Sequence, residues 1–310
     1  MTYYLAIDFG GTRTRAAWFD QSLTLLNRAE TLSQVSDSIE VVIQRIIDLA
    51  HSVVPQGKQP AAIGISAPGP LDAEKGIILH AETLPGWEGV PFARRISTAF
   101  AGVPTVMNND ANLAALAEYR FGAGRGCDPM IYLTISTGIG GGAIIGGKLF
   151  TGWRHLAIEP GHMRFTLADG SPRSLENLAS GTALGYWARQ RLQTDNRPSL
   201  LRDYATVDGK AVSAAAAVGD GLALEMIAET GRWLGLGLIN ILHMFNPQAI
   251  IIGGGVSQLG EMLLKPAKQV IKENILDRAY YDENLIRPAG LGEDVCLYGA
   301  AYYCSTGRFD

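Results

Sequence analysis

A strand, a glycine-rich turn and a second strand follow one another twice in this chain, and this repeat constrains the fold more than any other feature. The first copy covers residues 3–19, and the second covers residues 130–149. Placing residues 7–10 on residues 135–138 superposes the two patterns. Each copy is typical of a β-hairpin, and such self-similarity predicts two related lobes. Two facing glycine turns would form a cleft lined with phosphate-binding backbone N–H groups.

Helical and strand patterns alternate after the first hairpin. Apolar residues spaced by three and four predict a helix at residues 36–54, with Ser36 or Asp37 as its N-cap. The next predicted elements are a strand at residues 61–66, a helix at 91–100 and a strand at 102–107. An Ala- and Leu-rich helix then begins near Asp110. This alternation predicts an α/β fold.

The chain after the second hairpin is richer in helices. We predict helices at residues 182–192, 222–245, 261–274 and 296–305 and a buried strand at residues 248–252. We therefore predict an N-terminal lobe of residues 1–118 and a C-terminal lobe of residues 119–292. The last helix, within residues 293–310, is expected to pack back on the N-terminal lobe.

Composition excludes several classes of protein. The 310 residues carry a net charge of −4, which argues against a nucleic acid or an anionic membrane as the main partner. The three cysteines, Cys127, Cys296 and Cys304, form no disulfide framework and no Cys-x-x-Cys metal pair. No signal-peptide pattern opens the sequence, and the most apolar stretch, at residues 234–245, is too short for a membrane span. We therefore expect a soluble, cytoplasmic protein.

The junction at Asn109 and Asp110 is the strongest candidate for chemistry. These residues follow a predicted strand and begin a predicted helix, and ligands bind at the carboxyl ends of strands in open α/β sheets. A carboxylate beside an amide that can read a hydroxyl suits a general base for a substrate alcohol. The alternative is that one of the two residues only caps the helix.

Glycines mark further candidate positions. Asp8 precedes the turn Gly10-Gly11-Thr12, where backbone N–H groups could approach a ligand and the carboxylate could hold a cation, directly or through water. An ordinary hairpin with a solvated Asp8 is the alternative. Three glycines at residues 253–255 follow an apolar strand. They could let a base or ribose lie against the backbone, or they could form a tight turn from strand to helix.

Several short motifs occur in one order along the chain. They are Asp8-x-Gly10-Gly11-Thr12, Ala67-Pro68-Gly69-Pro70, Leu84-Pro85-Gly86-Trp87, Asn109-Asp110-Ala111-Asn112, Ser136-Thr137-Gly138-Ile139-Gly140-Gly141-Gly142, Glu159-Pro160-Gly161-His162, Glu176 with Ser180-Gly181, and Gly253-Gly254-Gly255. The combination resembles the ROK family of sugar kinases and regulators over essentially the whole chain. The resemblance implies two ribonuclease-H-like lobes of the actin/hexokinase (ASKHA) type with a central cleft for ATP and sugar. It also implies ATP with Mg²⁺ as the phosphoryl donor and a hexose or hexosamine as the acceptor.

The resemblance also implies roles for individual residues. Asp110 would be the general base. Sugar contacts would come from Gly69, Asn109, Glu159, His162 and Glu176. The nucleotide would be held by Asp8, Gly10, Gly11, Thr12, Arg13, Thr137, Gly138, Gly140, Gly254 and Gly255. Asp8 would hold Mg²⁺ through water, and Arg13 stands where many members of the family have lysine.

One segment departs from the family pattern. Many members carry a zinc loop with three cysteines after the Gly-His element, whereas residues 165–176 contain no cysteine. A structural zinc needs four nitrogen or sulfur ligands, which His162 alone cannot supply. We therefore expect no zinc and a loop held by hydrogen bonds and packing. Without the metal, the tautomer of His162 is less constrained.

The leading hypothesis is a glucokinase-like enzyme that phosphorylates the 6-hydroxyl of a hexose with ATP. The alternatives are an N-acetylmannosamine or N-acetylglucosamine kinase, a fructokinase, or a non-catalytic sugar-binding protein, against which the presence of Asp8 and Asp110 argues. A sugar-sensing repressor would need an N-terminal helix-turn-helix segment, whereas the first predicted strand begins at Tyr3. Asn109-Asp110 together with Glu159-x-Gly161-His162 favours a sugar substrate over a phosphatase or an acid kinase. The identity of the sugar stays open because pocket shape reads it, and a homodimer is the expected assembly.

Overall fold

The computed structural model describes residues 1–81 and 83–306. Contacts between Cα atoms divide the chain into two compact units. Unit 1 comprises residues 1–125, 149–157 and 290–310, and unit 2 comprises residues 126–148 and 158–289. The lobe boundaries predicted from the sequence, after residues 118 and 292, differ from these by a few residues. The prediction also placed residues 149–157 in the C-terminal lobe, whereas they belong to unit 1. Residues 307–310 of the predicted last helix lie outside the described residues.

Unit 1 is built on one mixed sheet of five strands. The strands are β1 (Tyr3–Phe9), β2 (Arg13–Asp20), β3 (Leu25–Leu32), β4 (Ala62–Ala67) and β7 (Thr105–Asn109), and their order in the sheet is β3-β2-β1-β4-β7. The pairs β1–β2 and β2–β3 are antiparallel, whereas β1–β4 and β4–β7 are parallel. A small second sheet joins β5 (Leu71–Asp72) to β6 (Ile77–Ile78).

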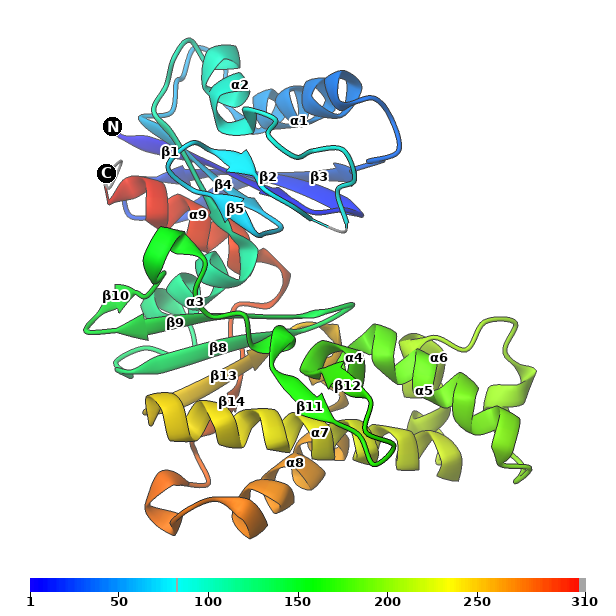
Figure 1. Cartoon of the computed structure of the whole chain (residues 1–310). Helices are drawn as coiled ribbons and strands as arrows, with labels where there is room; N and C mark the ends of the chain where they lie inside the picture. The colour runs from blue at the N-terminus through cyan, green and yellow to red at the C-terminus, as the bar shows by residue number, and fades with distance from the viewer. Residues whose placement is uncertain (82, 307–310) are drawn as a thin grey trace. The chain divides into compact units, whose positions relative to one another are not determined.

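Helices cover both faces of this sheet. The helices α1 (Ile39–Val53) and α2 (Phe92–Ala99) lie on one face, and α3 (Asp110–Phe121) and α9 (Val295–Ser305) lie on the other (Figure 1). Alternation along β1 explains the two layers, because Leu5 and Ile7 join the core below α1 and α2 while Ala6 joins the core below α9. A Cβ atom on Gly64 of β4 would lie 2.0 Å from the carbonyl oxygen of Ala300. Glycine therefore lets α9 pack directly on the sheet.

The sequence-based prediction for unit 1 was incomplete. The edge strand β3 was missed because its charged and polar residues hide the alternation of a strand. The predicted caps of α1 were wrong: Ser38 is the N-cap and makes no side-chain capping bond, while Asp37 pairs with Arg45 at 2.6 Å. The strand β7 begins later than predicted and runs through Asn109.

Unit 2 repeats the pattern of a hairpin followed by a parallel strand. Its sheet has the order β10-β9-β8-β13-β14, with β8 (Met130–Ile135), β9 (Ile139–Ile145), β10 (Lys148–Leu149), β13 (Ala249–Gly253) and β14 (Ile286–Pro288). The pair β8–β9 is antiparallel and β8–β13 is parallel, as β1–β2 and β1–β4 are in unit 1. The internal repeat predicted from the sequence is thereby confirmed. The second turn is shorter than predicted, because β9 begins at Ile139.

The helices of unit 2 pack around α7 (Gly221–Phe245), the long yellow helix of Figure 1. The other helices are α4 (Leu175–Ala179), α5 (Gly181–Thr194), α6 (Gly209–Ala217) and α8 (Glu261–Asn274). The helices α4 and α6 were not predicted. A β-hairpin of β11 (Arg164–Thr166) and β12 (Pro172–Ser174) precedes α4. Among the described residues, no single helix is long and apolar enough to cross a membrane; α6 and α7 reach that composition only together, across a bend of 119°.

Short 3-10 helices complete the described chain. They are Trp153–His155, Pro160–His162, Leu200–Asp203, Gly255–Leu259, Arg278–Tyr280 and Gly292–Asp294.

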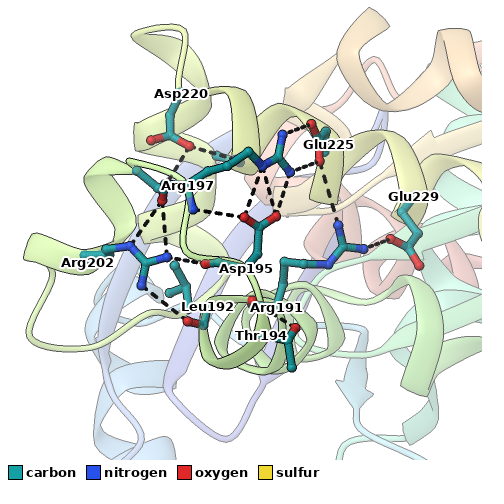
Figure 2. Close-up of polar contacts among 11 residues, drawn as sticks. Arg191, Leu192, Thr194, Asp195, Arg197, Arg202, Asp220, Glu225 and Glu229 are labelled. Carbon is teal, nitrogen blue, oxygen red and sulfur yellow. Dashed lines mark hydrogen bonds and ion pairs between the residues drawn. The ribbon is translucent and has the colours of Figure 1, made fainter.

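Charged side chains fasten the segment between α5 and α6 to the first turns of α7 (Figure 2). The guanidinium of Arg197 donates to Asp195 at 2.7 Å and to both carboxylate oxygens of Glu225 at 2.7 and 2.6 Å. Asp220 caps α7 by accepting the N–H of Ala223, and it also accepts the N–H of Leu200 at 2.6 Å. These contacts fix a segment, residues 195–208, whose only buried apolar side chains are Leu201 and Val207.

Candidate functional site

Asp8 lies near the end of β1 in a polar and largely enclosed setting. Ser66 Oγ donates to Asp8 Oδ1 at 3.0 Å, and Arg15 Nη1 donates to Asp8 Oδ2 at 3.2 Å. Burial raises the pKa of Asp8, whereas the hydrogen bond from Ser66 and the charge of Arg15 oppose the rise. Arg13, which the sequence analysis assigned to the phosphates, is half exposed and pairs with Glu30.

The cation that contacts Asp8 is therefore Arg15, which the sequence analysis did not single out. The register of the hairpin places Asp8 opposite Arg15. Counting outward from the turn at residues 10–12 would have identified this pair.

The first glycine turn is held in place by neighbouring backbone. The N–H of Gly10 donates to the carbonyl of Arg13 at 3.0 Å, and the N–H of Ser33 donates to the carbonyl of Thr12 at 2.9 Å. A Cβ atom on Gly11 would lie 2.8 Å from the carbonyl oxygen of Thr83. The turn is thus fixed in shape while Thr12 remains exposed. These features fit a site where backbone N–H groups meet a phosphate.

Asn109 and Asp110 have separate roles at the start of α3. Asn109 is the N-cap, and its Oδ1 accepts the N–H groups of Ala111 at 2.9 Å and Asn112 at 3.3 Å. Asn109 is therefore the residue of the pair that caps the helix. Asp110 is the first residue of the helix, and its Oδ1 accepts the N–H of Ala111 at 2.7 Å. A Cβ atom on Gly69 would lie 2.6 Å from Asn109 Nδ2, so these candidates of unit 1 come together.

Cys296 connects the surroundings of Asp110 and Asp8. Its Sγ donates to the carbonyl oxygen of Asp110 at 3.6 Å. Burial raises the pKa of this thiol well above its usual value, and the negative charges of Asp8 and Asp110 add to the effect. Both carboxylates therefore lie close enough to influence this thiol. Cys296 lies 186 residues from Asp110 in sequence, so no local pattern could have revealed the contact.

In unit 2, Glu159, His162 and Glu176 lie close enough to affect one another. The N–H of His162 donates to the carbonyl of Glu159 at 3.1 Å. Desolvation by the surrounding protein raises the pKa of the partly exposed Glu159 carboxyl. A positive charge on His162 opposes the rise, and the charge of Glu176 adds to it. The structure thus gathers the sugar-binding candidates of this unit.

Glu176 also reaches the second glycine turn. It lies in the first turn of α4, which Ser174 caps by accepting the N–H of Asn177 at 3.1 Å. From there its Oε2 accepts the N–H of Ile139 at 2.7 Å. A Cβ atom on Gly138 would lie 2.3 Å from the same oxygen. Glu176 is therefore placed against the turn as well as beside the other carboxylate of the set.

The remaining glycine candidates differ in their surroundings. Gly254 has a φ of +86°, and a Cβ atom on it would lie 2.4 Å from the carbonyl oxygen of Ile135 at the end of β8. A Cβ atom on Gly255 would meet no atom within 4 Å. Gly140 pairs with Thr134 inside β9, so it is a strand residue and the assigned turn was too long. Gly254 is thus packed against β8, whereas the space beside Gly255 is free of protein atoms within 4 Å. This arrangement would let a flat ligand lie against the backbone.

The hairpin β11–β12 joins the His162 element to Glu176 and is held by packing. The ring of Phe165 lies edge-on to Trp233 of α7 with centroids 6.0 Å apart, and the N–H of Leu175 donates to the carbonyl of Met163 at 2.9 Å. Across residues 1–81 and 83–306, no group of three or more His, Cys, Asp or Glu residues is arranged to hold a metal ion. The three cysteines are free thiols.

Comparison with known proteins gives consistent matches along the whole chain. The model of the ROK family matches residues 4–306. A glucokinase from Streptomyces coelicolor is 32% identical over 311 residues, covering 96% of each chain. The bifunctional enzyme NanE/NanK from Brucella melitensis is 34% identical over 303 residues, covering 97% of this chain and 54% of that protein.

Solved structures agree with these matches. A ROK family glucokinase from Streptomyces griseus, in complex with glucose and AMPPNP, superposes with a TM-score of 0.82 at 34% identity. The match covers 98% of this chain and 100% of that chain. A ROK hexokinase from Thermus thermophilus superposes with a TM-score of 0.80 at 30% identity and covers 99% of both chains.

Proposed function

The chain belongs to the ROK family, and from this premise we propose that it transfers the γ-phosphoryl group of ATP to the 6-hydroxyl of a hexose, with Asp110 as general base. The predicted actin/hexokinase type of fold is confirmed by the similarity to solved ROK kinases. The protein is an ATP-dependent sugar kinase.

The observation that carries the proposal is the division of roles at the start of α3. Asn109 caps the helix through two hydrogen bonds, so capping alone does not account for the carboxylate that follows it. Asp110 directly follows β7 and Asn109, whose side chain lies against Gly69. A base within hydrogen-bond reach of the accepting hydroxyl takes up its proton as the phosphorus–oxygen bond forms.

ATP with Mg²⁺ supplies the phosphoryl group and the positive charge that neutralises the phosphates. We assign the turn Gly10-Gly11-Thr12 and the turn at Thr137 and Gly138 to the phosphates, and Gly254 and Gly255 to the adenosine. Asp8 would hold Mg²⁺ through water, and the hydrogen bonds from Arg15 and Ser66 fix the position of its carboxylate. Arg13 remains a candidate for the phosphates at the exposed end of β2.

Glu159, His162 and Glu176 are assigned to the sugar ring hydroxyls. A carboxylate can accept hydrogen bonds from several hydroxyls at once, and a neutral histidine can donate one hydrogen bond and accept another. The rise in the pKa of Glu159 reflects desolvation and the nearby charge of Glu176. Hydroxyl donors from a sugar would stabilise both carboxylates in the charged form.

Two substrates have support among the relatives. Glucose is favoured because glucokinases of several organisms match almost the whole chain. The second candidate is N-acetylmannosamine or another hexosamine, because this chain is 34% identical to part of the NanE/NanK enzyme of Brucella melitensis. We also propose a cytoplasmic location, where ATP is the available donor, and a homodimer as the assembly.

The test is ADP release from ATP and Mg²⁺ across a panel of hexoses and hexosamines, with a no-sugar control. Sugar-dependent ADP release would support the kinase and rank its substrates, and NMR of the product would locate the phosphate on the ring. Binding of sugar without ADP release would instead favour the non-catalytic alternative. Phosphate on a hydroxyl other than the 6-hydroxyl would overturn that part of the proposal.

A further inference from the structure

We propose that Glu176 couples sugar binding to the conformation of the glycine turn at residues 136–138, so that each ligand raises the affinity for the other. The inference rests on the proposed function, in which Glu176 contacts the sugar and this turn receives phosphate. It adds a positioning role for Glu176 toward the turn. The observations that carry it all lie within unit 2.

The carboxylate of Glu176 has two oxygens and uses one of them on the backbone. Its Oε2 accepts the N–H of Ile139, the residue that directly follows the turn, at 2.7 Å. A carboxylate can accept several hydrogen bonds, so one group can bind a sugar hydroxyl and the turn together. A hydrogen bond with a charged acceptor is about twice as strong as a neutral one. Loss or rotation of this carboxylate would therefore break the hydrogen bond that holds the backbone N–H of Ile139.

The segment that begins with Glu176 makes two further backbone hydrogen bonds to the turn. The N–H of Gly181 donates to the carbonyl of Ser136 at 2.7 Å, and the N–H of Thr182 donates to the carbonyl of Thr137 at 3.4 Å. A Cβ atom on Gly181 would lie 2.8 Å from the Ser136 carbonyl oxygen. The turn is therefore attached to the start of α4 and the start of α5, while Ser136 and Thr137 remain exposed.

The 3-10 helix that contains His162 packs against Ile139 from the side of its carbonyl group. A Cβ atom on Gly161 would lie 2.2 Å from the carbonyl oxygen of Ile139, so the 3-10 helix Pro160–His162 packs directly on this residue. The side chain of Ile139 is 4% exposed. Ile139 is thus fixed by Glu176 at its N–H and by the His162 element at its carbonyl. A ligand that orders both elements also orders the end of the turn.

Ordering of the Glu176 side chain links the free energies of binding of the two ligands. A sugar hydroxyl that donates to Glu176 restricts the rotamers of its side chain, and the cost of ordering the carboxylate is then already met when a phosphate reaches the turn. Such coupling is reciprocal, because it is a property of the doubly bound state. Coupling free energies between sites typically change affinities by about 5- to 150-fold.

The test compares nucleotide affinity with and without sugar. Isothermal titration calorimetry gives the Kd of Mg²⁺-AMPPNP in the absence of sugar and at saturating glucose, or at a saturating level of whichever sugar ranks first in the ADP assay. We expect the wild-type ratio of these Kd values to be about fivefold or more. We expect Glu176→Ala to bring the ratio to within about twofold of one, and Glu176→Gln, which keeps an acceptor for Ile139, to restore part of it.

The matched control is Glu159→Gln, which alters a carboxylate of the same sugar-binding set that lies in a different element. It should weaken sugar binding and lower the Kd ratio at saturating sugar by less than Glu176→Ala does, because the Pro160–His162 helix contacts Ile139 through the backbone at Gly161 and not through the Glu159 carboxylate. A wild-type ratio retained in Glu176→Ala would overturn the inference while leaving the kinase proposal intact. Absence of sugar-dependent ADP release in the wild type would instead contradict the proposed function.

Hydrogen exchange provides a second measurement that needs no variant. Sugar alone, without nucleotide, should slow amide exchange in a peptide that covers residues 136–141 of the wild-type protein. Unchanged exchange in that peptide at saturating sugar would also overturn the inference, because the proposed coupling requires sugar to order this backbone.

Discussion

Arg15 and Asp8 face each other across the hairpin of β1 and β2, with Arg15 Nη1 3.2 Å from Asp8 Oδ2. The side chains are 17% and 13% exposed, respectively. Arg15 also lies 3.3 Å from Glu293 and 3.6 Å from Glu30. The carboxylate that we assign to Mg²⁺ is therefore held by a cation from the next strand, while the more exposed Arg13 pairs with Glu30.

Replacing Arg15 with glutamine should lower the free energy of unfolding by about 1–3 kcal/mol, because it removes a charged partner from a largely buried carboxylate. Arg13→Gln is the matched control on the same strand. Its side chain is 53% exposed, and its effect should stay within about 0.5 kcal/mol. Urea denaturation of both variants measures the difference. Equal losses in the two variants would contradict the structural importance of the Arg15–Asp8 pair.

Asp110→Asn should reduce kcat by about 10²- to 10⁴-fold, because the amide cannot take up the proton of the accepting hydroxyl. The fold should persist, since Asn109 caps α3 in the structure. Steady-state ADP release and circular dichroism measure the two effects. A turnover close to that of the wild type would remove Asp110 from the role of general base.

Alanine at Gly254 and at Gly255 should have different effects. Gly254→Ala combines a φ of +86° with a contact of 2.4 Å to a backbone oxygen, so it should lower thermal stability. Gly255→Ala adds a methyl group to open space. We expect near-normal stability for this variant and a higher KM for ATP, with the KM for sugar unchanged. An unaltered KM for ATP would argue against an adenosine position beside Gly255.

Acid should weaken unit 2 through the cluster in Figure 2. Hydrogen bonds from Arg197 lower the pKa of Asp195 from 3.8 to about 2. The folded state therefore binds fewer protons than the unfolded state in this range, and the stabilising contribution is complete above the unfolded pKa and lost as the pH falls through about 2. Arg197→Gln should flatten the dependence of unfolding free energy on pH below about 4. If this variant showed the same acid dependence as the wild type, Arg197 would not be the group that lowers the pKa of Asp195.

Chelation should leave the protein unchanged, because packing holds the β11–β12 hairpin. EDTA or 1,10-phenanthroline should not shift the Tm, and elemental analysis should find no stoichiometric zinc. Trp233→Ala, which removes the partner of the Phe165 ring, should lower the free energy of unfolding by about 1–3 kcal/mol. It should also weaken sugar binding. A Tm that falls in chelator would reveal a metal contribution.

The fold was largely predictable from local patterns. The two glycine hairpins and the long helix near residues 222–245 stand out because backbone sterics and apolar spacing act between near neighbours. The strand β3 and the short helix α4 did not stand out. Their residues are placed by the sheet edge and by packing on α7, which override weak local preferences.

The candidate site divides in the same way. The sequence alone determined which residue types stand at the ends of strands and in glycine turns, and the match to a family pattern singled out Asp8, Asp110 and Glu176. Only the tertiary structure decided their partners. Arg15 faces Asp8 through strand register, and Glu176 reaches Ile139 across 37 residues of sequence. The physical reason is that hydrogen bonds and ion pairs between distant segments depend on how whole elements pack, which local sequence does not encode.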